Sequence, residues 1–242
     1  LFFFTPLIAA MAGNVGVQIA KISPINAGER VWTVTPQDVA TIGELFLTGK
    51  FNATRTVALV GSEVKEAQYY NVISGAAITD LVAGKIEGDN VRVISGDVLT
   101  GTKVNMDGNL GFYSNTVTVI PEGNVYRMFG WMPFASPSVH SASRTGLSWL
   151  MPGKKYAPNT NLNGEERALV VTGEMEAVMP LDIFPMQLLK ACLASDIDKM
   201  ESLGIYEVAP EDFALIDYTN TSKLEAQQII REALDLMIKE VG

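Results

Sequence analysis

The chain has 242 residues, enough for one large or two ordinary domains, and its 48% hydrophobic and 19% charged content excludes a disordered protein. A net charge of −9 and a pI near 4.7 exclude the basic surface of nucleic-acid-binding proteins, and no polybasic membrane anchor is found. With one cysteine, Cys192, and one histidine, His140, the chain can form neither an internal disulfide nor a Cys/His zinc site, so we expect no metal.

The first ten residues, LFFFTPLIAA, are unusual for the start of a protein. No basic residue precedes them, as a signal peptide requires, and the apolar run ends by Gly13, which is short of the roughly 20 residues of a membrane helix. We therefore expect no transmembrane segment and a fragment that begins inside a domain, although the origin of these ten residues is unexplained.

Residues 1–50 are predicted to be the C-terminal part of a truncated, Rossmann-like α/β domain. Strands are expected at 15–24 and 31–34, followed by a helix that Thr35 caps, Pro36 begins and Gly49 ends. Helical spacing predicts that its buried face consists of Val39, Ile42, Leu45 and Phe46.

Gly13, Asn14 and Gly16 form a turn signal before the first predicted strand. The pattern is not the GxGxxG fingerprint, and a strand follows it where a dinucleotide site needs a helix. Two interpretations stay open: a tight turn, or a loop that faces a ligand or partner.

Residues 51–125 are predicted to form a β-grasp domain. Strands are expected at 55–61, 68–75, 91–96 and 109–121, with a short helix at 76–84 between the second and third. Strand, strand, short helix, strand, strand is the element order of a β-grasp.

Residues 126–168 are predicted to be an irregular connection rich in aromatic, proline and serine residues. Long loops of this kind are usually functional or linkers. Trp131 and Trp149 either fill a local core in a loop tucked against the β-grasp domain or belong to a docking surface for a membrane-embedded partner. Ser138, His140 and Ser141 lie close together, but no GxSxG motif surrounds them, so we expect no catalysis there.

Residues 169–242 are predicted to form a helical domain. Pro185 begins one helix, Asp196 caps a second, and Pro210 opens a third. Ser222 and Glu225 are expected to form a capping box for the last helix, which runs to about Glu240.

This domain resembles a two-cluster ferredoxin domain without its ligands. Such domains place cysteines at offsets 0, 3, 6 and 10 with a proline after the last. Aligned on Pro180, and again after Gly204, the eight ligand positions are Leu169, Thr172, Met175, Met179, Val208, Glu211, Ala214 and Tyr218. None is a cysteine, so an iron–sulfur cluster is excluded on chemical grounds.

The spacer PLDIFPMQLLKACLASDIDKMESLG resembles that of the C subunit of Rnf-type electron-transfer complexes. The string AGNVGVQIAKISPINAGERVWTVTPQDVATIGELFLTG is more specific and closely resembles the A subunit of the Na+-translocating NADH:quinone reductases. The string VRVISGDVLTG is similar to the soluble ligand-binding β-grasp module of that family and of complex I relatives.

The resemblance implies a peripheral subunit on the cytoplasmic face of the bacterial inner membrane. The complex would oxidise NADH, reduce ubiquinone or a related quinone and export Na+, and its flavins and iron–sulfur centre would lie on other subunits. The partners would be the membrane subunits, especially the quinone-reducing one, with no nucleic acid. This fragment would act as a scaffold, dock partner subunits and be associated with the quinone. It would have no redox centre and no catalytic residue of its own.

Two alternatives belong to other classes. One is a stand-alone β-grasp module that binds a ligand or partner and is not part of a pump. The other is a cluster-bearing electron-input subunit of an Rnf complex or complex I, against which the absent cysteines argue.

Overall fold

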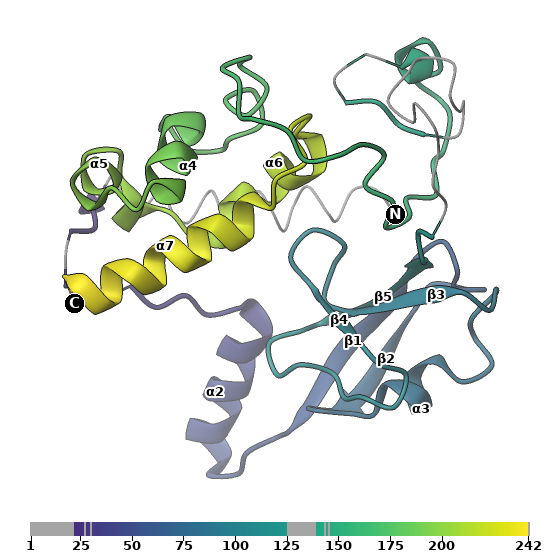
Figure 1. The fold of residues 1–242 in the computed structure, drawn as a ribbon. Helices are drawn as coiled ribbons and strands as arrows, with labels where there is room; N and C mark the ends of the chain where they lie inside the picture. Colours follow the sequence, from purple (N-terminus) through teal and green to yellow (C-terminus); the bar gives the residue numbers. More distant parts are fainter. Residues whose placement is uncertain are drawn as a thin grey trace. The chain divides into compact units, whose positions relative to one another are not determined.

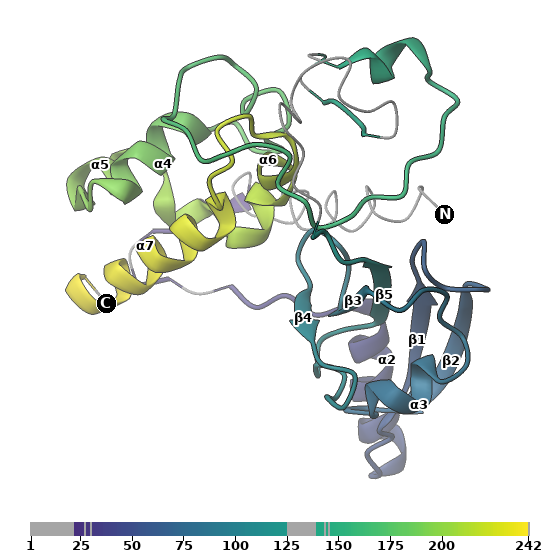
Figure 2. The same cartoon turned by 45° about the vertical axis from the view of Figure 1, so that its right-hand side comes forward.

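A computed structural model describes residues 22–26, 28–29, 31–124, 139–142, 144 and 146–241. The chain divides into two compact units (Figures 1 and 2). The sheet unit comprises Val31–Tyr126 and Gly153–Asn161, and the helical unit comprises Leu1–Arg30, Arg127–Pro152 and Leu162–Gly242. The chain is therefore of the α+β class, as predicted.

The sheet unit contains one mixed five-stranded sheet. Its strands are β1 (Thr54–Val60), β2 (Gln68–Ile73), β3 (Val91–Ser95), β4 (Thr102–Val104) and β5 (Thr116–Pro121). Their spatial order is β2-β1-β5-β3-β4, with β1 and β5 parallel and the other pairs antiparallel. The short helix α3 (Ile78–Val82) follows β2, as the spacing of its apolar residues predicts.

The apolar core of this unit lies between the sheet and α3. Ile78, Leu81 and Val82 of α3 are buried in one cluster with strand residues that include Val57 and Val119. Gly61 ends β1 with φ 129°, and a Cβ there would lie 1.9 Å from the Val119 carbonyl oxygen, so this turn requires glycine.

Two details of the sheet differ from the prediction. The segment expected as a strand at 109–121 is extended only from Thr116, because Asn109–Asn115 makes turns that hydrogen-bond back to the sheet. The three-residue strand β4 was not predicted, since it is too short to show alternation and has no buried residue.

The helix α2 (Pro36–Thr48) has the predicted ends but not the predicted environment. The Thr35 side chain accepts a hydrogen bond from the Asp38 amide. Gly49 ends the helix at φ 71°, and its amide donates to the Leu45 carbonyl. The predicted buried face is wrong for this structure, because no α2 residue is buried. The exposed fractions are 57% for Val39, 46% for Ile42, 38% for Leu45 and 85% for Phe46.

Polar contacts hold the first turn of α2 to the sheet unit. Gln37 bonds to the Asn115 side chain and to the Thr56 amide, and Asp38 forms an ion pair with the buried Arg55 at 2.5 Å. The four apolar side chains therefore stay outside the core of this unit.

The two strands predicted before α2 are not seen in the described residues. Among the described residues no strand pairs with 31–34, so this segment is irregular, and the Trp32 side chain is 86% exposed. Of the segment at 15–24 only 22–24 is described: Ile22 is helical, and the other two residues are irregular.

The helical unit has short helices around one longer helix. They are α4 (Pro185–Leu193), α5 (Ile197–Ser202), η2 (Ile205–Glu207), η3 (Pro210–Phe213), α6 (Ala214–Thr219) and α7 (Ala226–Glu240), and η1 (Leu147–Leu150) lies earlier in the chain. Pro185 and Pro210 begin their helices, and Asp196 caps α5, as predicted. Fully buried Leu188, Phe213 and Ile230 lie in the centre of its core, and Cys192 is a buried member of the same cluster.

The predicted Ser222–Glu225 capping box is wrong. The Ser222 hydroxyl donates to the Ala168 carbonyl, and α7 begins only at Ala226. The carboxylate of Asp217 in α6 caps α7 instead, because it accepts hydrogen bonds from the backbone amides of Ala226 and Gln227. Sequence spacing cannot show such a non-local cap.

Candidate functional site

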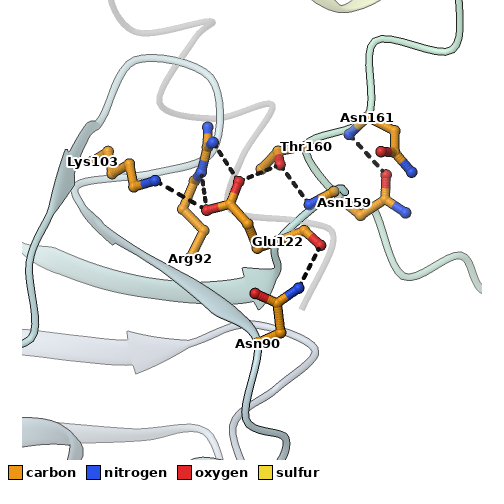
Figure 3. Close-up of polar contacts among 8 residues, drawn as sticks. Asn90, Arg92, Lys103, Glu122, Asn159, Thr160 and Asn161 are labelled. Atoms are coloured by element: carbon orange, nitrogen blue, oxygen red, sulfur yellow. Dashed lines mark hydrogen bonds and ion pairs between the residues drawn. The ribbon is translucent and has the colours of Figure 1, made fainter. Parts of the chain in front are cut away.

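A well-connected polar group of the sheet unit is the carboxylate of Glu122, directly after β5 (Figure 3). Arg92 on β3 binds it through two nitrogens at 2.5 and 3.0 Å, and the Lys103 ammonium on β4 lies 3.2 Å from it. The hydroxyl of Thr160 donates to it at 2.7 Å. Three chain segments therefore meet on one carboxylate.

Electrostatics strongly favour the ionised form of Glu122. The hydrogen bonds from Arg92, the largest cause, and those from Thr160 and Lys103 lower the pKa of Glu122 to about 2, against an opposing desolvation. The group is therefore a permanent anion at physiological pH and no general acid or base.

The same residues tie the returning chain to the sheet. The Gly123 amide donates to Thr160 Oγ1 at 2.7 Å, and a Cβ on Gly123 would lie 2.2 Å from the Asn161 nitrogen. This approach requires a glycine, so the Glu122 cluster clamps residues 159–161 to the end of β5.

A cavity of about 640 Å³ opens beside the cluster. Its lining is predominantly polar and consists of Asn90, Val91, Arg92, Val93, Lys103, Val104, Asn105, Met106, Glu122, Gly123, Asn124 and Thr160. Although four lining residues are apolar, most of the exposed lining is polar, so the cavity presents little apolar surface to a quinone ring. Sequence reasoning missed this site, since Arg92 and Glu122 meet only through the register of β3 and β5.

The candidate binding residues are divided between described and undescribed parts of the chain. Gly13, Asn14, Gly16 and Trp131 lie outside the described residues. Trp149 lies in η1 and is 54% exposed, so it does not fill a local core in the helical unit. The Glu122 cluster, in contrast, belongs to the sheet unit.

The eight positions aligned with cluster ligands in the sequence fall into two groups. Met175, Val208 and Ala214 are buried, and Leu169 and Met179 pack against the same core. The remaining three, Thr172, Glu211 and Tyr218, are exposed.

Tyr218 contacts the single histidine. Its hydroxyl oxygen lies 3.0 Å from His140 Nδ1, and the two rings stack with centroids 6.1 Å apart. The neighbouring Ser141 bonds to Ser148 and Gly146 instead. The hydroxyls of Ser141 and Ser148 therefore accept backbone amides, and His140 and Ser141 do not form a nucleophile–base pair.

Within the described ranges, no three His, Cys, Asp or Glu side chains come together in a way that could hold a metal ion. None of the helices in that part of the chain combines the length and apolar character needed to cross a bilayer.

Family models match two consecutive parts of the chain. Residues 10–51 match the NqrA second alpha/beta domain, and residues 56–106 match the NQRA C-terminal domain. These matches identify two segments of this α+β chain as similar to NqrA domains.

The relatives carry one name, that of the A subunit of the Na+-translocating NADH-quinone reductase. The protein of Neisseria meningitidis serogroup B is 39% identical over 230 residues, which is 95% of this chain and 51% of that protein. Those of Serratia proteamaculans and Marinomonas sp. are 39% and 38% identical, with 51% and 52% of their lengths covered. The predicted resemblance to NqrA is thereby confirmed, and the chain spans about half the length of the curated relatives it matches.

Proposed function

We propose that the chain is part of a peripheral subunit of a membrane complex that oxidises NADH, reduces a quinone and exports Na+. The observation that carries this proposal is the 39% identity to the A subunit of such complexes over 95% of the chain. We place the protein on the cytoplasmic side of the membrane, with the membrane subunits, above all the quinone-reducing one, as partners.

Within that complex the helical unit acts as a scaffold. The positions that would carry cluster thiolates in a two-cluster ferredoxin domain hold Met175, Val208 and Ala214, which fill the core. Thioether and hydrocarbon side chains cannot replace thiolate ligands, so electrons pass through cofactors on other subunits.

The sheet unit acts as a β-grasp module. The parallel pairing of β1 with β5 between two antiparallel hairpins, and α3 against the sheet, support this assignment. Residues 51–125 form this domain, and the clamp at Glu122 fixes the start of the connection to the helical domain at 169–242.

The exposed apolar face of α2 is an internal domain surface. Residues 10–51 match the NqrA second alpha/beta domain, and we expect the part of the relatives' length that this chain does not span to cover this face. Gly13, Asn14, Gly16 and Trp131 remain candidates for contacts with quinone or with partner subunits.

Co-purification tests the proposal. A tagged form of the chain, extended to the length of its relatives, should bring down hydrophobic subunits from detergent-solubilised membranes, together with NADH-dependent quinone reduction. Recovery of the tagged protein alone under these conditions would instead favour a stand-alone β-grasp module.

Titration with a soluble quinone, on the extended protein and on this chain in parallel, then locates quinone contacts. Binding by both places at least part of the site within these 242 residues. Binding by the extended protein alone restricts this chain to scaffold and docking. Binding by neither means that the quinone site requires a membrane subunit or that NqrA is not quinone-associated.

A further inference from the structure

The turn around η1 exposes apolar side chains and buries the serine in its middle. Ser148, in the middle of η1, is buried, whereas its neighbours Trp149 and Leu150 are 54% and 57% exposed. Leu147 and Met151 are exposed by 39% and 40%. A short helical turn on a water-facing surface normally has the opposite arrangement.

Serine hydrogen bonds fix this arrangement. The Ser148 hydroxyl accepts the Ser141 amide at 2.9 Å, and the Ser141 hydroxyl accepts the Gly146 amide at 3.0 Å. The Met151 amide closes the turn on the Ser148 carbonyl at 3.0 Å. The polar groups of the turn thus satisfy one another inside, and the four apolar side chains are held outward.

The charge of the surrounding sequence differs from that of the rest of the chain. Between Glu122 and Glu165 there is no acidic residue, although the whole chain has a net charge of −9. The same stretch contains Arg127, Arg144, Lys154 and Lys155. Arg144 precedes η1 by three residues and the two lysines follow it by four and five, so basic residues flank the apolar turn on both sides in sequence.

We infer that the turn at Leu147–Met151 inserts into the headgroup region of an anionic phospholipid bilayer. Tryptophan prefers that interface because its ring is apolar and its N–H is polar, and leucine and methionine gain from burial at the acyl boundary. Spaced arginine and lysine side chains complement anionic headgroups without forming a polybasic cluster. The complementary charge, in an otherwise acidic chain, favours lipid over an uncharged apolar protein surface.

This inference deepens the proposed function and rests on it, because a peripheral protein that also touches lipid is oriented on the bilayer beside its partners. It is tested on the chain alone, without other subunits, so that its failure is distinct from a failure of complex formation.

The first measurement is fluorescence quenching. Replacement of Trp32 and Trp131 by phenylalanine leaves Trp149 as the only tryptophan. With vesicles of phosphatidylcholine and phosphatidylglycerol, Trp149 emission should shift to the blue and be quenched by lipids brominated near the headgroup end of their acyl chains. An emission maximum and intensity unchanged by these vesicles would overturn the inference.

The second measurement is vesicle flotation of matched variants. Trp149→Ala and Leu150→Ala should each weaken binding about tenfold, whereas Trp32→Ala, which removes an equally large exposed ring from the sheet unit, should leave it unchanged. Equal losses for Trp32→Ala and Trp149→Ala would overturn the inference.

The charge requirement has its own control. Lys154→Gln and Lys155→Gln should each weaken binding to anionic vesicles about fivefold, with binding falling further as salt is added. The pair Lys50→Gln and Lys239→Gln, which also removes two exposed lysines, should have little effect. If Trp149→Ala leaves flotation unchanged but prevents co-purification with membrane subunits, the turn binds protein and the lipid inference is wrong.

Discussion

The carboxylate of Asp217 in α6 lies 2.5 Å from the backbone nitrogen of Ala226, the first residue of α7. It also accepts the Gln227 amide at 3.3 Å and the Gln227 side chain at 2.8 Å. The first amides of a helix have no partner within the helix, so a side chain from elsewhere that accepts them stabilises it. Because α7 carries Ile230 and Met237 into the core, this cap positions the main helix of the unit.

Removal of this cap should destabilise the helical unit. We expect Asp217→Ala to lower its free energy of unfolding by about 1–2 kcal/mol, and Asp217→Asn to cost less because one acceptor oxygen remains. Urea unfolding followed by circular dichroism gives both values. Asp235→Ala on the exposed side of α7 is the control, and an equal loss there would contradict the capping role.

The pH dependence of the sheet unit should follow Glu122. Its pKa is lowered from 4.5 to about 2, so its contribution to stability is fully present above pH 4.5 and is lost as the pH falls toward 2. The contribution is on the order of 2 kcal/mol for a partly screened cluster. Glu122→Gln should lower the free energy of unfolding at pH 7 and reduce its fall between pH 4.5 and pH 2, which we call the acid limb.

The measurement is the urea midpoint of the sheet unit between pH 2 and 6. Glu87→Gln, an exposed carboxylate on the same unit, should keep the wild-type slope. In the helical unit Asp217 has the opposite effect on stability, because burial raises its pKa: its contribution is present below the ordinary value of 3.8 and is lost as the pH rises through the higher folded value. An unchanged acid limb in Glu122→Gln would show that the cluster contributes nothing.

The positions aligned with cluster ligands separate into core and surface. Met175 is 2% exposed, and we expect Met175→Ala to lower the free energy of unfolding by about 2–5 kcal/mol through the cavity it leaves. Thr172→Ala, three residues earlier and exposed, should change it by less than about 0.5 kcal/mol. Similar costs at both positions would contradict the interpretation of Met175 as core filling.

Local signals predicted the ends of elements well. Thr35, Pro36 and Gly49 fix α2 through hydrogen bonds that span four residues or fewer, and Asp196 fixes the start of α5 in the same way. Contacts over so few residues can be predicted from the spacing of residue types in the sequence. The class of the chain and its resemblance to NqrA could also be predicted from the sequence, because both rest on short sequence motifs.

Contacts between distant segments could not be predicted. The Glu122 cluster depends on the pairing of β3 with β5 and on a segment 38 residues later, and the α7 cap depends on a carboxylate in another helix. The same limit explains why Ser222 was assigned to a capping box: its spacing from Glu225 fits, but its hydroxyl is engaged by the Ala168 carbonyl.

The apolar face of α2 gives a prediction that depends on chain length. Helical periodicity marks Val39 and Phe46 as a buried face, yet they are 57% and 85% exposed here. Phe46→Ser should therefore change the free energy of unfolding of this chain by less than about 0.5 kcal/mol. In a protein extended to the length of its relatives, the same change should cost about 3–5 kcal/mol, because we expect the additional residues to cover the helix.

Thermal and urea unfolding of both proteins measure the difference. Leu59→Ala, in the core of the sheet unit, is the control and should be costly in both lengths because its burial comes from this chain alone. Equal, small effects of Phe46→Ser in both proteins would mean that α2 stays uncovered within the longer protein. Its apolar face would then be available to another member of the complex, and the same substitution should reduce co-purification of the membrane partners.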